Sequence, residues 1–162
     1  KRRVLVGDHV ALHFENRDTM HYQVQEMLRA EESWLRPGAF ADELEAYNPI
    51  IPKSGELSAT MMIEYATAAE RAVMLPQFVA IDQHVWLQIG DAPRVRATFD
   101  AGQIDEHKVS SVQYIKFGLD ERQRRLLKED GVVVRVSIDH PAYTAQAVMS
   151  EETRKAIAGD PD

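Results

Sequence analysis

The chain contains no cysteine among its 162 residues. Disulfide bonds, thiolate zinc sites, iron–sulfur clusters bound by the chain and cysteine nucleophiles are therefore excluded. Its eight glycines are dispersed singly, so the glycine-rich loops that hold phosphates or dinucleotides are absent and no nucleotide cofactor is expected. The sequence also lacks the G-x-S-x-G and H-E-x-x-H motifs, which mark two readily recognised classes of hydrolase.

Long apolar runs and an excess of basic charge are lacking as well. No run approaches the roughly 20 apolar residues of a transmembrane helix, and no signal peptide is visible, so we expect a cytoplasmic protein without a membrane partner. The formal net charge of −7 would repel phosphate backbones, and nucleic acid is therefore not an expected partner. The chain opens at Lys1 without a methionine, and we expect further residues upstream.

The apolar content of 44% suits one compact domain over residues 1–162. Alternating apolar residues predict strands at 9–15, 57–65, 85–89, 95–99, 109–117 and 132–138. Helical spacing and capping residues predict helices at 19–35 (N-cap Asp18 or Thr19), 39–47, 68–79, 121–128 and after Ser150, with a frayed tail at 159–162. Pro76 is expected to kink or split the helix 68–79. The predicted class is α+β, with a largely antiparallel sheet of about five or six strands packed with about three to five helices.

The predicted helix 19–35 is the densest functional candidate. Its apolar stripe comprises Met20, Val24, Met27, Leu28, Trp34 and Leu35. Glu31 falls within this stripe, and a buried carboxylate there would need a cation such as Arg17, Arg71 or Arg96. Alternatively, the helix ends before residue 31 and releases Glu31 to water.

A polar ladder follows one edge of the same stripe. Its members are His21, Gln25, Arg29 and Glu32, which are spaced so that neighbours can contact one another along the helix. This edge of the helix carries a cation, an amide and an imidazole, which are suited to binding a carboxylate or a partner helix. The alternative is an ordinary solvated helix edge.

The predicted strand 9–15 offers a metal-binding pattern. His13 and Glu15 project from one face about 7 Å apart, so both could bind the same metal ion. A third ligand would come from His21, just across the turn, or from His140, which follows a predicted buried strand. The alternative is that His13 and Glu15 line a solvated strand face and that His140 is exposed in a turn closed by Asp139.

Several blocks of the sequence resemble a known family. The blocks are Phe-Glu-Asn-Arg at 14–17, Gln-Val-Gln-Glu-Met-Leu-Arg at 23–29, Glu-Leu at 43–44 with Tyr-Asn-Pro at 47–49, the segment 110–117, and His-Pro-Ala-Tyr at 140–143. Together they are similar to a bacterial family of uncharacterised proteins, the domain of unknown function 3501 family, over nearly the whole chain. The resemblance carries over no catalytic residues. The resemblance implies a redox or oxidative-stress setting, because the gene neighbourhoods associated with members of that family include rubrerythrin-like and iron–sulfur proteins.

Two functions are consistent with these patterns. The first is an accessory or binding protein that holds a partner protein or a small anionic ligand with His21, Gln25, Arg29, Glu31, Glu32 or His140. The second is a small metal-dependent, redox-linked enzyme with His13, Glu15 and either His21 or His140 as ligands, for which a metal ion would be the cofactor. Trp86 and Tyr114 lie on the less apolar faces of their strands, where a second helix layer or a subunit interface would cover them. A homodimer is therefore consistent with the sequence.

Overall fold

The computed structural model describes residues 1–32 and 35–162, and nine strands within them form two antiparallel sheets. The five-stranded sheet has the order β1 (Arg3–Leu5), β2 (Val10–Glu15), β3 (Glu56–Ile63), β7 (Val112–Gly118), β6 (Thr98–Phe99). The four-stranded sheet has the order β5 (Val95–Arg96), β4 (Val85–Ile89), β8 (Val134–His140), β9 (Tyr143–Val148). The predicted α+β class is confirmed, with the strands divided between two sheets where the sequence suggested one.

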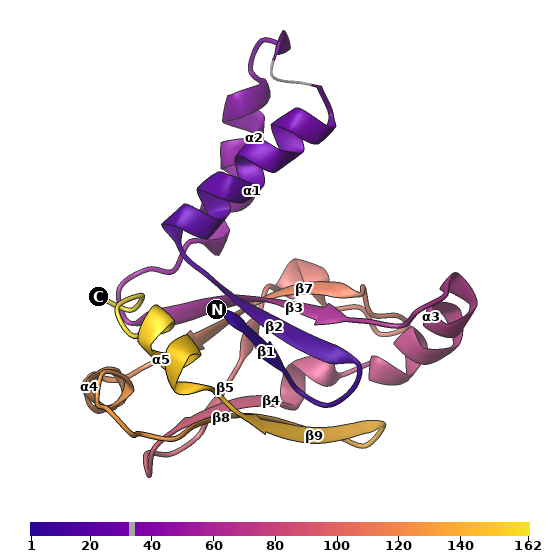
Figure 1. Cartoon of the computed structure of the whole chain (residues 1–162). Helices are drawn as coiled ribbons and strands as arrows, with labels where there is room; N and C mark the ends of the chain where they lie inside the picture. The colour runs from indigo at the N-terminus through magenta and orange to yellow at the C-terminus, as the bar shows by residue number, and fades with distance from the viewer. Residues whose placement is uncertain (33–34) are drawn as a thin grey trace.

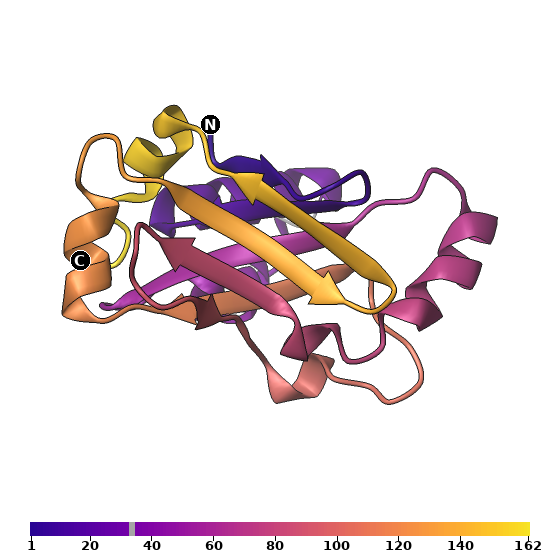
Figure 2. The same cartoon turned by 90° about the horizontal axis from the view of Figure 1, so that it is seen from below.

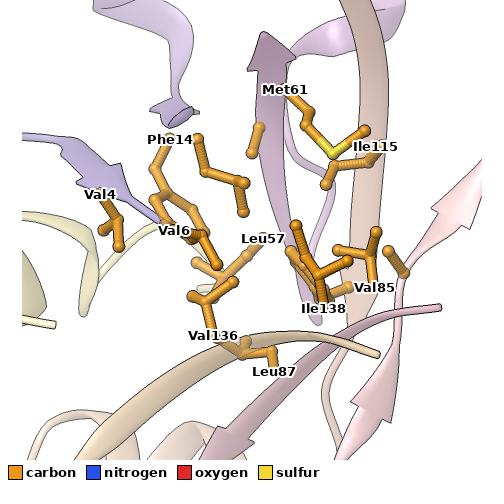
Figure 3. Packing of buried hydrophobic residues seen from close by; sticks show 14 of the residues in the cluster. Val4, Val6, Phe14, Leu57, Met61, Val85, Leu87, Ile115, Val136 and Ile138 are labelled. Atoms are coloured by element: carbon orange, nitrogen blue, oxygen red, sulfur yellow. The ribbon is translucent and has the colours of Figure 1, made fainter. Parts of the chain in front are cut away.

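The two sheets lie one above the other and enclose the main hydrophobic core (Figure 1). Alternate side chains of each strand point inward, as the two-residue period of a strand requires. Phe14, Leu57 and Met61 come from the five-stranded sheet and belong to the same cluster as Leu87 and Val136 of the four-stranded sheet, part of which Figure 3 shows. All five are at most 1% exposed, so one continuous cluster joins both sheets.

The chain passes from one sheet to the other within the predicted strand 95–99. β5 pairs with β4, whereas β6 pairs with β7, and the buried Ala97 lies between them. At the opposite side, the Tyr143 hydroxyl donates to the Val6 carbonyl at 2.6 Å and accepts from the His9 backbone N–H at 3.0 Å. The continuous chain therefore joins the sheets along one side, and the Tyr143 hydrogen bonds join them along the other.

Five α-helices lie around this pair of sheets: α1 (Arg17–Ala30), α2 (Ala39–Tyr47), α3 (Ala68–Met74), α4 (Glu121–Leu127) and α5 (Glu151–Ile157) among the described residues. The α1–α2 hairpin projects from the side of the five-stranded sheet, while α3 lies at one end of the molecule and α4 and α5 at the other (Figure 1). Figure 2 shows the outward face of the four-stranded sheet without a covering helix. Within residues 1–32 and 35–162, no helix is both long and apolar enough to cross a membrane.

α1 begins earlier than predicted and is capped by Asn16, not by Asp18 or Thr19. The Asn16 side chain accepts from the Thr19 N–H at 2.9 Å, and the Thr19 hydroxyl accepts from the Asn16 N–H at 2.9 Å. This reciprocal capping box satisfies two backbone donors and fixes where the helix leaves β2.

α1 also ends earlier than predicted. Glu31 is its C-cap and Glu32 has a φ of 50°, a left-handed conformation that an α-helix cannot contain. Both side chains are exposed, so the alternative in which Glu31 is released to water is the one that the structure adopts. Of the predicted apolar stripe, Leu35 is exposed and Trp34 lies outside the described residues.

The C-terminal tail is packed, and the prediction that it frays is wrong. Arg2 binds the Asp160 carboxylate, and the Gly55 N–H donates to the Pro161 carbonyl at 2.6 Å. Lys128 pairs with Asp162 at 2.7 Å. The tail therefore joins the N-terminus, the start of β3 and the end of α4.

Candidate functional site

A pocket of about 370 Å³ lies between the α1–α2 hairpin and the outward face of the five-stranded sheet. We call it the hairpin pocket. Its lining consists of His13 and Glu15 from β2, Met20 and Gln23 from α1, Tyr47 from α2, Thr60 and Met62 from β3, and Val112 and Tyr114 from β7. Two of these residues, His13 and Glu15, are candidates that the sequence identified.

The register of the sheet sets the floor of the hairpin pocket. His13 lies opposite Thr60, and Thr60 lies opposite Tyr114, so the three form a row across β2, β3 and β7. Glu15 and Met62 share this outward face because each lies two residues from a member of the row. The inward residues between them belong to the main core, so the burial of the core also fixes which side chains face the pocket.

The helical wall of the pocket has a small core of its own. Met20 and Gln23 are three residues apart and therefore lie on the same side of α1. Val24 and Leu28 of α1 pack with Ala39 of α2 in a cluster separate from the main core, and Leu44 and Tyr47 pack against it. The hairpin thus holds Met20, Gln23 and Tyr47 over the sheet.

The pocket contains one carboxylate, which has a neutral partner. The Thr60 hydroxyl donates to Glu15 Oε1 at 3.0 Å, and both side chains are half-buried. No ion pair joins Glu15 to a basic side chain in the described part of the chain. The nearby basic residues bind other carboxylates: Arg2 binds Asp160, Arg3 binds Glu64 at 3.2 Å, and Lys116 binds Glu56 at 2.8 Å. Glu15 therefore places an uncompensated negative charge in the pocket.

Tyr47 and Tyr114 contribute aromatic rings and hydroxyl groups to the same space. Burial raises the pKa of Tyr114 above its usual value, and the nearby Tyr47 and Glu15 raise it further. The Tyr114 phenol therefore stays protonated at neutral pH. A protonated phenol offers a hydroxyl group and an electron-rich ring face rather than a second negative charge.

The ladder predicted on α1 does not line the hairpin pocket. His21, Gln25 and Arg29 are exposed on the side of α1 that faces solvent, and Glu32 is exposed beyond the end of the helix. Arg29 forms a surface ion pair with Glu26 at 3.0 Å. Residues on the opposite side of the helix, Met20 and Gln23, are the ones that reach the pocket.

The structure brings His13 and Glu15 together but not their predicted partners. His21 is exposed on α1, whereas His140 is buried at the end of β8 in the other sheet. The Ala142 N–H donates to His140 Nδ1 at 3.0 Å, so Nε2 carries the proton and donates to the Val79 carbonyl at 2.8 Å. Across residues 1–32 and 35–162, no group of three or more histidine, aspartate or glutamate side chains is placed to hold a metal ion.

The rest of the pocket came from elements that sequence reasoning did not connect. In the sequence, Tyr114 stood out as an aromatic residue on the less apolar face of its strand, and Tyr47 and Tyr114 both fell in blocks that resemble the family, but neither was a candidate site residue. Gln23, Thr60 and Met62 carried no functional signal. They meet because β2, β3 and β7 are neighbours in the sheet, which is a tertiary property.

Comparisons with known proteins give one family model and one solved structure that match nearly the whole chain. The family model described as "Protein of unknown function (DUF3501)" matches residues 1–161. The chain is also similar to a solved structure, a novel protein of unknown function from Burkholderia pseudomallei K96243, with a TM-score of 0.89 and 33% sequence identity. That match covers 99% of this chain and 84% of the other. No curated protein matches the sequence significantly.

Proposed function

The chain belongs to the DUF3501 family of proteins of unknown function, as its sequence blocks predicted, and we propose that it is an accessory ligand-binding protein whose site is the hairpin pocket. The pocket itself carries the proposal. Its volume of about 370 Å³ lies in the range of small-molecule sites. Its lining combines side chains from two helices and three strands, so the folded hairpin and the sheet are both needed to form it.

The composition of the lining supports a binding site for a small organic molecule. Met20, Met62 and Val112 supply apolar surface, while His13, Glu15, Gln23 and Thr60 supply polar groups. Ligand sites commonly have such an apolar wall with a few converging polar groups that orient the ligand. The proposed binding site thus lies on the inner side of α1, opposite the exposed side chains of His21, Gln25 and Arg29.

A metal-dependent enzyme has less support than a binding protein. His13 and Glu15 would supply two ligands, and the described residues offer no third histidine or carboxylate beside them. Two protein ligands are fewer than the three that catalytic zinc sites use. The binding function needs no such addition.

We place this binding function in a bacterial cytoplasm. The absence of cysteine suits a reducing compartment, and the net charge of −7 disfavours nucleic acid and anionic lipid as partners. A homodimer stays a prediction. The partly exposed Trp86 on the open face of the four-stranded sheet is consistent with it.

A fragment titration followed by two-dimensional NMR tests the site. Cationic, neutral and anionic fragments are added to ¹⁵N-labelled protein, and we expect shifts of the backbone amides of Thr60, Met62 and Tyr114. Met62→Trp should fill the pocket and abolish these shifts. Gln146→Trp, on the exposed face of the other sheet, is the control for adding the same ring and should leave them intact.

The proposal fails if no fragment moves the pocket amides of the folded protein. It also fails if Met62→Trp keeps a folded spectrum and binds as well as the wild type. The dispersion of each variant's spectrum establishes that it is folded before binding is compared.

A further inference from the structure

The charge of the hairpin pocket points to a class of ligand. Glu15 is half-buried and receives a hydrogen bond only from the neutral Thr60 hydroxyl among the described side chains. A carboxylate that is partly removed from water is stabilised by an opposite charge. The rings of Tyr47 and Tyr114 add electron-rich faces to the same lining, and such faces attract cations.

The other sheet holds a similar set of groups with a cation of the chain itself in place. The Arg94 guanidinium carbon lies 3.7 Å from the centroid of the Trp86 ring. Asp139 accepts hydrogen bonds from Arg94 at 3.5 Å, from the Trp86 indole at 3.1 Å and from His84 at 3.0 Å. Here an aromatic face and a carboxylate together bind an internal guanidinium.

The hairpin pocket has the aromatic faces and the carboxylate but no internal cation. No lysine or arginine is among its lining residues in the described chain. His13 is its other ionisable group besides Glu15 and the two tyrosines. A cation from solution would take the place that Arg94 occupies in the other sheet.

We infer that the hairpin pocket binds a small alkylammonium ion, whose charged nitrogen pairs with Glu15 and contacts the rings of Tyr47 and Tyr114. The inference rests on the function proposed above and names the ligand class of the same site. Met20, Met62 and Val112 account for the alkyl groups, because they offer apolar surface that a hydrated metal ion could not use. An anionic ligand would meet the uncompensated charge of Glu15, so it is disfavoured.

Matched probes distinguish the effect of ligand charge on binding affinity from the effect of ligand shape. Choline is compared with 3,3-dimethyl-1-butanol, its neutral isostere, and with 3,3-dimethylbutyrate, which carries the opposite charge; butylammonium serves as a primary ammonium probe. Each is titrated against the full chain at low ionic strength and about pH 8, above the ordinary range of histidine titration. We expect either cation to bind at least about ten-fold more tightly than the neutral isostere.

Three variants assign the effect to the pocket. Glu15→Gln keeps an oxygen acceptor for Thr60 but removes the charge, and it should weaken cation binding about ten-fold while leaving the neutral isostere unchanged. Glu45→Gln removes the same charge from an exposed position on α2 and should change neither the affinity for the cations nor the affinity for the neutral isostere. Tyr114→Leu removes one aromatic face and should weaken cation binding about three-fold or more, which keeps a test available if Glu15→Gln fails to fold.

The outcomes distinguish this inference from the function on which it rests. If the neutral or anionic probe moves the pocket amides at least as strongly as the cations, the ligand class is wrong but the binding site stands. If the cations bind and Glu15→Gln matches Glu45→Gln, the ligand class is likewise overturned. If no probe moves the pocket amides of the folded protein, both the inference and the proposed function fail.

Discussion

The Thr60 hydroxyl donates a 3.0 Å hydrogen bond to the Glu15 carboxylate and joins β3 to β2 at the floor of the hairpin pocket. The bond gives the carboxylate a protein donor without cancelling its charge. Stability and ligand preference therefore depend on different members of the pair, since Thr60 supplies the hydrogen bond and Glu15 supplies the charge.

Thr60→Val tests the first of these roles. The substitution keeps the branched shape of the side chain but leaves the Glu15 carboxylate without its donor, which should lower the free energy of unfolding by about 1 kcal/mol. Urea denaturation measures this change. Thr98→Val, at an exposed position on β6, is the matched control, and an equal loss in both variants would mean that the Thr60–Glu15 bond contributes nothing.

Gly7→Ala should disrupt the link between the sheets. Gly7 has a φ of +75°, and a Cβ there would collide with the Tyr143 hydroxyl that binds Val6. Gly38 has a similar φ of +80° but open space around it, so Gly38→Ala isolates the cost of the backbone conformation, about 1 kcal/mol. We expect Gly7→Ala to cost at least about 1 kcal/mol more than Gly38→Ala in denaturant unfolding. Equal costs would show that Tyr143 moves aside freely.

Glu56 should contribute to the acid sensitivity of the fold. Burial alone would raise its pKa, but the hydrogen bonds from Lys116 and the Lys53 N–H more than offset this, so the pKa lies below its usual value of 4.5. A carboxyl group with a lowered folded-state pKa stabilises the protein above the unfolded value, and this contribution is lost as pH falls through the folded value.

Glu56→Gln should therefore be less stable than the wild type near about pH 7, and the difference should shrink as the pH falls below about 4.5. Urea midpoints measured over this range test the prediction. A difference that is constant with pH would mean that the ionised Glu56 carboxylate does not stabilise the fold.

His140→Phe and Arg29→Ala test two candidates that the structure places outside the pocket. His140→Phe removes the hydrogen bonds to Val79 and Ala142 and should cost about 2 kcal/mol of stability. Arg29→Ala breaks only a surface pair and should change stability by less than about 0.5 kcal/mol. Neither should alter choline binding, and a selective loss of binding in either folded variant would place the site elsewhere. Isothermal titration at matched temperature makes the comparison.

Local patterns in the sequence were sufficient for most elements. The alternation at 9–15 predicted β2, and the residues Thr67, Asp120 and Ser150 cap α3, α4 and α5 as their residue types indicated. The end of α1 was harder to predict, because Glu31 and Glu32 have good helix propensity. In the structure, the left-handed backbone of Glu32 shows where the helix stops. β9 was missed since its inward positions include the small residues Ala145 and Ala147, which give little hydrophobic contrast.

The division into two sheets and the composition of the pocket depend on tertiary structure. The stretch 95–99 alternates like one strand, yet Val95–Arg96 and Thr98–Phe99 pair in different sheets. Likewise, the pairing of His13 with Glu15 was visible in the sequence, whereas Tyr47 and Tyr114 come from distant segments. Sequence periodicity predicts which face of its own strand or helix a residue lies on. It does not predict which other element packs against that face.

Intermolecular nuclear Overhauser effects between the methyl protons of choline and the protein test the central claim most directly. The account predicts effects to the ring protons of Tyr47 and Tyr114 and to the methyl group of Met20, all lost in Glu15→Gln at the same choline concentration. It would be contradicted if choline bound with effects confined to Trp86 on the open face of the four-stranded sheet, or with effects at Tyr114 that persist undiminished in Glu15→Gln.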